Sequence, residues 1–232
     1  MSLRLDGLWR YPVKTLAGER LSHVHVNSSG LEGDRIVRVR GPEGVRTSRR
    51  HYRLLGLSGS LDADGYARIN GQRWDSPEAL ALVKAAAGDD AWLEATHVTC
   101  RFDVLPLLIA TDGAVALFGR DVRRLRPNLL IGGVEGLDEA SWPGAELHVG
   151  EMIVRIDSRR SRCPMTTVDP DTLVRDHEVL RDIGRRFSGR LALNAAVVRG
   201  GTIHVGDSVK LIRDSGADAE PAHGSKLGES RF

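Results

Sequence analysis

The chain has 232 residues, which is enough for one large domain or two small ones with a substantial hydrophobic core. Its hydrophobic content of 41%, charged content of 28% and net charge of +2 are ordinary for a soluble globular protein and do not favour nucleic acid as a partner. The first residues lack the apolar stretch of a secretion signal, and no apolar run reaches the length of a membrane span. We therefore expect a cytoplasmic protein that contacts no membrane.

Short strand signals dominate the chain. Alternating polarity and flanking turn residues predict strands over residues 3–11, 23–26, 35–40, 66–69, 104–110, 128–131, 146–149, 152–156, 195–198 and 202–212. The dipeptide Asp64-Gly65 predicts a tight hairpin turn. Because the strands are many and short, with few helices between them, the sequence predicts a mainly β, barrel-like fold.

Helices are few. Ser76 as a cap, Pro77 at the first helical position and Gly88 at the exit predict one helix that runs to residue 87. Two more are predicted over 112–118, with Asp112 as the cap, and over 176–187. The segment 76–95 then separates the domains that we predict, listed in chain order: an N-terminal β-rich unit over 1–95, a second β unit over 96–214 and a flexible polar tail over 215–232.

One stretch, SRRSRCPMTTVDP over residues 158–170, places Cys163 among arginines and hydroxyls. The thiolate is the form of cysteine that binds soft metals, and nearby positive charge favours that form. Arginine also binds phosphate through paired hydrogen bonds, so this stretch combines a soft ligand with donors for an anion. The alternative is a small buried hydrophobic residue. The other cysteine, Cys100, lies outside every motif, and we expect it in the core.

Four segments occur in a recognisable order, and a weaker fifth, Val205-Gly206-Asp207, follows them. They are Tyr11-Pro12-Val13-Lys14-Thr15, then GLEGDR over 30–35, RPNLLI over 126–131 and SRCPMTTVDPD over 161–171. This order resembles the MOSC family, named for the C-terminal domain of molybdenum cofactor sulfurase. It is most similar to the two-part members with an N-terminal β-barrel unit, such as the mitochondrial amidoxime-reducing component and YcbX-type proteins.

The resemblance implies a MOSC-type β-barrel with a few peripheral helices, preceded by a β-barrel-like MOSC N-terminal unit. It also implies binding of the molybdenum cofactor, molybdopterin, which is a pterin dithiolene with a phosphate. Cys163 would be the molybdenum ligand and the catalytic residue, because a soft thiolate suits a thiophilic metal. The cofactor-binding residues that the resemblance implies are Lys14, Thr15, Arg35, Arg126 and Asn128 around the pterin and phosphate, and Ser161, Arg162 and Thr166 beside the cysteine.

The chemistry of these residues alone leaves structural alternatives open. Arg35 follows a tight turn that would aim it inward, or it forms a surface pair with Asp34. Arg126 precedes Pro127, which fixes the entry of a strand, and the pair is open to a purely structural role. Asn128 suits the edges of a pterin ring, yet asparagine also commonly forms turns.

The chain departs from the family pattern in three respects. Leu191-Ala192-Leu193-Asn194 stands where many relatives carry Phe-Gly before an asparagine, and Thr15 replaces the more usual serine. A four-cysteine ferredoxin extension is also missing from the sequence, so electrons would come from separate electron-transfer proteins.

Three functions remain open at this stage. The leading hypothesis is an oxidoreductase in which the molybdenum cofactor reduces a small-molecule substrate with an N-hydroxylated or related N–O or S–O group. The second is a sulfur carrier or cofactor carrier, in which Cys163 holds a persulfide or docks the cofactor for delivery. The third is a MOSC scaffold that only binds. The histidines show no ligand spacing that would indicate another metal site, and the sequence does not indicate the oligomeric state.

Overall fold

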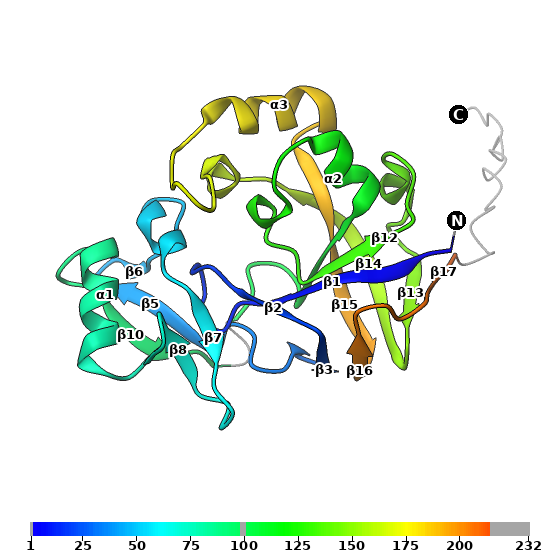
Figure 1. The fold of residues 1–232 in the computed structure, drawn as a ribbon. Coiled ribbons are helices and arrows are strands. Elements are labelled where there is room, and N and C mark those ends of the chain that lie inside the picture. The colour runs from blue at the N-terminus through cyan, green and yellow to red at the C-terminus, as the bar shows by residue number, and fades with distance from the viewer. Residues whose placement is uncertain (1, 98–100, 214–232) are drawn as a thin grey trace, which may run out of the picture.

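The computed structural model describes residues 2–97 and 101–213. Cys100 and the tail over 215–232 lie outside the described residues, so the expectations for them stay predictions. The described chain is mainly β, with one large sheet, three small sheets and a few helices at the periphery (Figure 1). The predicted fold class is confirmed.

The large sheet has eight strands. Their spatial order is β17 (Val209–Ile212), β13 (Glu146–Val149), β14 (Met152–Ser161), β15 (Arg190–Arg199), β11 (Leu107–Thr111), β12 (Leu129–Gly132), β1 (Arg4–Arg10) and β2 (Glu19–Leu21). Neighbours are antiparallel except β11 and β12, which are parallel. Backbone N–H groups of Leu5 and Val209 donate to the carbonyls of Asp207 and Leu3, both at 2.9 Å, so β1 meets the start of β17 and the sheet closes into a barrel.

The smaller elements surround this barrel. The small sheets are β16 (Gly201–His204), β3 (His23–Asn27) and β4 (Gly30–Leu31); β10 (Trp92–Ala95), β5 (Val37–Gly41) and β6 (Gly44–Val45); and β7 (Gly59–Leu61), β8 (Ala67–Ile69) and β9 (Gln72–Arg73). The helices are α1 (Pro77–Ala87), α2 (Asp112–Phe118) and α3 (His177–Phe187), with short 3-10 turns η1 (Tyr52–Gly56), η3 (Val122–Arg124), η4 (Asp138–Ser141) and η5 (Pro164–Thr167).

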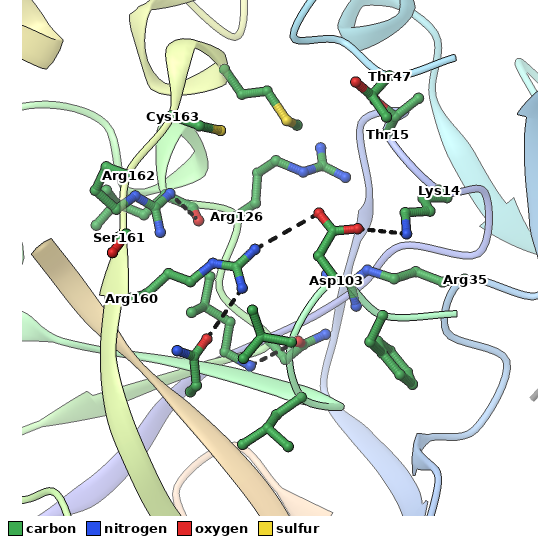
Figure 2. Close-up of a pocket in the computed structure, with 18 of the residues that line it drawn as sticks. Lys14, Thr15, Arg35, Thr47, Asp103, Arg126, Arg160, Ser161, Arg162 and Cys163 are labelled. Carbon is green, nitrogen blue, oxygen red and sulfur yellow. Dashed lines mark hydrogen bonds and ion pairs between the residues drawn. The ribbon is translucent and has the colours of Figure 1, made fainter. Parts of the chain in front are cut away.

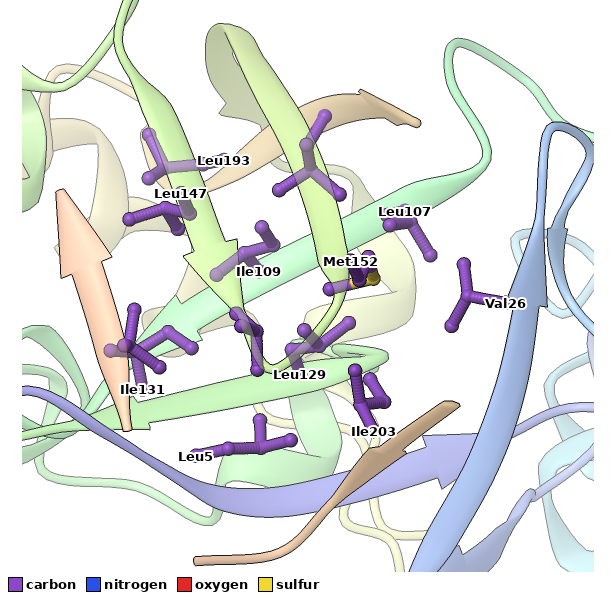
Figure 3. Close-up of a cluster of buried hydrophobic side chains, with 14 of the residues drawn as sticks. Leu5, Val26, Leu107, Ile109, Leu129, Ile131, Leu147, Met152, Leu193 and Ile203 are labelled. Atoms are coloured by element: carbon purple, nitrogen blue, oxygen red, sulfur yellow. The ribbon is translucent and has the colours of Figure 1, made fainter. Parts of the chain in front are cut away.

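The barrel encloses the largest hydrophobic core. Alternate residues of its strands point inward, so Leu5, Ile109, Leu129 and Leu147 meet although they come from four different strands (Figure 3). Each of these side chains is fully buried. Burial of one such side chain stabilises the fold by roughly 1.5–3 kcal/mol. The barrel therefore provides a rigid support for the segments at its rim.

A second core lies in the N-terminal half, where α1 packs Ala79, Val83 and Ala87 against the strands of the two small sheets there. The predicted caps of α1 are confirmed: the Ser76 hydroxyl accepts a hydrogen bond from the Ala79 N–H at 3.2 Å, and Gly88 follows the helix with φ of +108°.

The sheets connect the two halves of the chain. β1 pairs with β12, so an N-terminal strand joins the large sheet, which is built mostly by the second half. In a separate small sheet, β16 from the second half pairs with β3 from the first. The boundary at residue 95 stays a prediction. In both pairings, one strand lies before residue 95 and its partner lies after it.

Several predicted element boundaries were wrong. The strand predicted from 104 begins at Leu107, after Pro106, and the run 202–212 is two strands separated by a turn at Gly206. The cap of α2 is Thr111, whose hydroxyl accepts from the Ala114 N–H. The carboxylate of Asp112, the predicted cap, accepts instead from the N–H groups of Gly133 and Val134, at 2.8 and 2.9 Å.

Candidate functional site

A pocket lies where the N-terminal half meets the barrel (Figure 2). Its described lining comes from segments far apart in the sequence, namely 14–15, 35, 47–49, 102–108, 124–128, 160–165 and Asn194. The basic side chains around it are Lys14, Arg35, Arg49, Arg124, Arg126, Arg160 and Arg162, whereas the acidic side chain among the described lining residues is Asp103. Such an excess of positive charge in a concave site favours an anionic ligand.

One wall comes from the turn after β1. The Lys14 ammonium forms an ion pair with Asp103 at 2.7 Å and donates to the Arg101 carbonyl at 3.1 Å. The Thr15 hydroxyl bonds the Ser48 hydroxyl and accepts from the Ser48 N–H, both at 2.6 Å. Lys14 thus faces the pocket, and Thr15 fastens the turn that carries it to the loop after β6.

Arg35 belongs to the same wall. Its guanidinium pairs with Asp34, and it lies 5.3 Å from the centre of the Tyr11 ring and 5.4 Å from that of Phe102. Asp34 is fully buried, so the pair is not the surface pair that the sequence left open as an alternative. The Asp34 carboxylate also accepts from the Tyr11 N–H at 2.7 Å.

Arg126 rises from the loop before β12, beneath Cys163 (Figure 2). Its guanidinium lies 4.2 Å from the centre of the Tyr11 ring and has no hydrogen bond or ion pair to any residue in 2–97 or 101–213. Burial lowers the pKa of Arg126 to about 10, so it is still a cation at neutral pH. A partly buried cation without a counter-ion is a place for an anion.

Tyr11 organises both arginines. Its ring lies beside Arg35 and Arg126, and its hydroxyl donates to the Pro127 carbonyl at 3.0 Å. Burial raises the pKa of Tyr11 to about 12, so the hydroxyl keeps this proton at neutral pH. The hydrogen bond joins the turn after β1 to the loop before β12.

Cys163 follows the end of β14 and precedes η5, with its side chain half-buried at the pocket (Figure 2). Neighbouring Arg162 donates to the Leu125 carbonyl at 2.8 Å, while its Nε is buried without a hydrogen-bond partner among the described residues. Burial lowers the pKa of Arg162 to about 10, and Cys163 is close enough to interact electrostatically with both Arg126 and Arg162. The sulfur therefore lies within electrostatic reach of two guanidinium groups.

Two residues expected at the cofactor form hydrogen bonds within the protein. Thr166, within η5, is fully buried and is not among the residues that line the pocket; its hydroxyl donates to the Cys163 carbonyl at 2.9 Å and holds the cysteine's backbone. Asn128 lines the pocket, but its amide joins two strands, accepting from the Leu108 N–H and donating to the Trp9 carbonyl, both at 3.2 Å. Ser161 lies at the rim as expected.

Sequence reasoning missed the residues that complete the charge balance. Asp103 lies between the walls and contacts Lys14, Arg49 at 3.1 Å and Arg160 at 3.9 Å. Arg160 also donates to the Asn194 side-chain oxygen at 3.3 Å. The available signal was that Arg160 belongs to the same arginine-rich stretch as Cys163.

The backbone around the pocket is strained. Thr15, Arg35 and Arg126 all have positive φ, at 81°, 52° and 57°. Each such residue costs of order 1–3 kcal/mol and persists where its surroundings hold it, commonly at ligand sites. Because these three residues come from separate turns around one pocket, the strain marks the pocket as a site rather than as a gap in the packing.

Among the described residues, no group of three or more His, Cys, Asp or Glu side chains is arranged to hold a metal. The donors do suit a phosphate-bearing cofactor whose metal accepts a single protein thiolate. Within 2–97 and 101–213, Arg126 has no counter-ion and the buried Nε of Arg162 has no partner, while Cys163 provides the soft ligand. Lys14, Arg35, Arg126 and Arg162 would hold the anionic part of such a group, and Cys163 would bind its metal.

Comparison with known families agrees with this architecture. The MOSC N-terminal beta barrel domain matches residues 2–102, and the MOSC domain matches residues 113–210. The two matches together span most of the chain, which belongs to the MOSC family. The pocket receives side chains from both matched regions, and Asp103 lies between them.

Curated relatives match over shorter stretches. Human mitochondrial amidoxime-reducing component 1 is 31% identical over 129 residues, which is 47% of this chain and 38% of that protein. Molybdenum cofactor sulfurase 2 of Culex quinquefasciatus is 39% identical over 70 residues, which is 30% of this chain and 9% of that protein. The chain thus spans well under two thirds of the length of these relatives.

Among solved structures, the YUAD protein from Bacillus subtilis aligns with a TM-score of 0.48 and 12% identity, over 91% of this chain and 96% of that one. None of the helices within 2–97 and 101–213 is long and apolar enough to span a membrane.

Proposed function

We propose that this protein binds the molybdenum cofactor in the pocket beside Cys163 and reduces small N-hydroxylated or related N–O and S–O compounds. The observation that carries the proposal is Arg126: a cation with no described counter-ion, held with strained backbone between Tyr11 and the cysteine. The names of relatives, amidoxime-reducing components and molybdenum cofactor sulfurases, support the cofactor and the reaction class.

Reduction of an N–OH group takes up two electrons and two protons and releases the oxygen as water. When bound, the cofactor would supply the two-electron redox chemistry that this reduction requires. Cys163 would bind the metal, while Arg126 and Arg162 hold negative charge beside it. Lys14 would bind phosphate after its ion pair with Asp103 opens. We propose that a separate electron-transfer protein supplies the electrons.

The test combines metal content with turnover. Protein from a host that makes the cofactor should contain molybdenum and should reduce an amidoxime with a chemical reductant. Cys163→Ser should reduce turnover to background while the melting temperature stays close to that of the wild type, because a hydroxyl is a poor ligand for a soft metal. Cys100→Ser, the same chemical change elsewhere, is the matched control. Turnover by Cys163→Ser near the wild-type rate would refute the proposal.

The similarity to cofactor sulfurases favours a second candidate, in which Cys163 carries a persulfide or the chain passes the cofactor to another protein. A half-buried cysteine beside guanidinium groups suits that chemistry as well. The same assay separates the two candidates. A carrier should show no molybdenum-dependent turnover. After incubation with a persulfide donor, whose outer sulfur transfers to the thiolate while the donor leaves as a thiol, its Cys163 should gain one sulfur atom by mass spectrometry.

A further inference from the structure

A second cavity of about 430 Å³ adjoins the cysteine pocket. Cavities of roughly 300–1,000 Å³ are typical of small-molecule sites. The two cavities share Arg124, Arg126 and Met165 in their linings, and Met165 is two residues from Cys163. The second cavity, which we name the side chamber, therefore opens next to the proposed reaction centre.

The walls of the side chamber are mostly apolar and come from both halves of the chain, through Trp9, Tyr11, Leu55, Val122, Met165, Val168 and Pro170. Two glycines keep its aromatic rings close against the backbone. A Cβ at Gly18 would lie 2.5 Å from the Tyr11 ring, and one at Gly7 would lie 2.7 Å from the Trp9 indole. Flat aromatic walls of this kind favour a flat apolar ligand.

The charged side chains of the side chamber fall into two groups. Arg123 is neutralised by Asp121 and Asp171, both at 2.7 Å, and Arg124 bonds Asp169 at 2.8 Å. Arg20, in contrast, is exposed on β2 and has no hydrogen bond or ion pair to any residue that the structure describes. Its guanidinium lies 5.8 Å from the centre of the Trp9 ring.

We infer that the side chamber binds the body of the substrate and that Arg20 selects substrates with a terminal carboxylate. This inference rests on the proposed function for its reaction: the reducible group would enter the Cys163 pocket past Met165, while the flat apolar body lies against Trp9. A carboxylate at the far end would meet Arg20.

The charges explain this choice of class. A guanidinium that rests against an aromatic ring keeps its N–H edge free for two parallel bonds to a carboxylate. Arg126 at the inner end adds positive charge, so both ends of the side chamber disfavour a cationic substrate. If the end of the substrate were neutral, the N–H groups of Arg20 would continue to bond water and would add nothing to its affinity. The preferred substrate is therefore apolar in the middle and anionic at the end away from the reducible group.

Binding is measured first without the cofactor, so that the result does not depend on turnover. Calorimetry on the full chain compares 2-naphthoate with neutral 2-naphthamide. We expect the carboxylate to bind roughly ten-fold more tightly, as for one partly exposed charge-assisted contact. Arg20→Gln should remove this preference. Arg181→Gln, an exposed arginine on α3, is the matched control and should keep the preference. Val122→Trp should fill the side chamber and weaken both probes.

Three outcomes would overturn the inference: no binding of either probe, an unchanged preference in Arg20→Gln, or unchanged binding of both probes in Val122→Trp. The second outcome would place the carboxylate on Arg126 instead. The cofactor-loaded protein is then assayed with an aromatic amidoxime that carries a para-carboxylate and with its methyl ester. The acid should have the higher kcat/KM, and Arg20→Gln should equalise the two. If the probes bind as expected but neither amidoxime is reduced, the proposed function fails while the binding site stands.

Discussion

The two walls of the Cys163 pocket hold their positive charge in different ways. On the N-terminal wall, Lys14 is paired with Asp103 and Arg35 with Asp34. On the barrel wall, Arg126 has no described counter-ion and Arg162 has a buried Nε without a described partner. An incoming anion must therefore displace a carboxylate at Lys14, whereas it meets the donors of Arg126 directly.

This difference has energetic consequences. A hydrogen bond to a charged group contributes roughly 1.5–3 kcal/mol when nothing has to be given up for it. At Lys14 the gain is reduced by the ion pair that is lost. At Arg126 binding also relieves a cation that burial leaves uncompensated. We expect the barrel wall to dominate affinity and the N-terminal wall to control which anions displace Asp103.

The largest effect is expected at Arg126. Arg126→Met keeps an unbranched chain over the Tyr11 ring but removes the charge, so cofactor retention should fall about ten- to a hundred-fold. The melting temperature should not fall, because the variant no longer buries an uncompensated cation. Molybdenum content after gel filtration and a thermal melt provide the two readouts. A variant that melts earlier and keeps its molybdenum would contradict the role of the barrel wall.

A smaller, two-directional effect is expected at the N-terminal wall. Lys14→Ala should weaken pyrophosphate binding to the cofactor-free chain about three- to ten-fold, and Asp103→Asn should strengthen it by a similar factor. Titration calorimetry at two salt concentrations measures both, and the effects should shrink at high salt. If Asp103→Asn binds pyrophosphate more weakly, Asp103 supports the site instead of competing for it.

The sequence carried enough information to predict the fold class and the segments that meet at the pocket. Patterned strands and turn signals predicted the β fold, and the order of motifs pointed to Lys14, Arg35, Arg126 and Cys163, which the structure brings around one pocket. Their roles at a cofactor stay predictions. Motifs of this kind can be recognised in a sequence because each contains a residue that a specific chemistry requires.

The details that failed depend on three-dimensional neighbours. Asp112 resembles a helix cap, but the end of β12 offers it two N–H groups, so the cap passes to Thr111. Asn128 lines the pocket and its amide also joins neighbouring strands, so its role at a cofactor stays a prediction. Asp103 stands in a segment without motif or periodicity, and only the fold places it against Lys14. Local sequence cannot report which partner a polar group finds across the chain.

The barrel also contains a buried carboxyl group, Glu139, whose contribution to folding stability should depend on pH. Glu139, on η4, accepts hydrogen bonds from the Thr111 hydroxyl at 2.6 Å and the Ala192 N–H at 3.1 Å. Burial raises the pKa of Glu139 above its ordinary value of 4.5. The folded state therefore binds the proton more tightly than the unfolded state. This contribution to stability is full below pH 4.5 and is lost as pH rises through the folded pKa.

Glu139→Gln should remove this pH dependence. Between pH 5 and pH 7, urea unfolding should show a smaller loss of unfolding free energy in this variant than in the wild type, because the variant has no carboxyl group at this position to release a proton. Glu135→Gln, an exposed carboxylate on the preceding loop, is the control and should behave as the wild type. A wild-type pH difference in Glu139→Gln would show that another group titrates.

The smallest effect concerns backbone strain at Ala192, whose N–H donates to Glu139. Ala192 on β15 has φ of 69°, a conformation that costs an alanine roughly 1–2 kcal/mol. Ala195, on the same strand, is not among the residues with positive φ, and both methyl groups are buried. Glycine at either position loses a buried methyl group and makes the unfolded chain more flexible, but only Ala192→Gly also relieves strain. Ala192→Gly should therefore cost about 1 kcal/mol less unfolding free energy than Ala195→Gly in urea titrations. Equal costs would mean that the backbone at position 192, whose N–H donates to Glu139, is not strained.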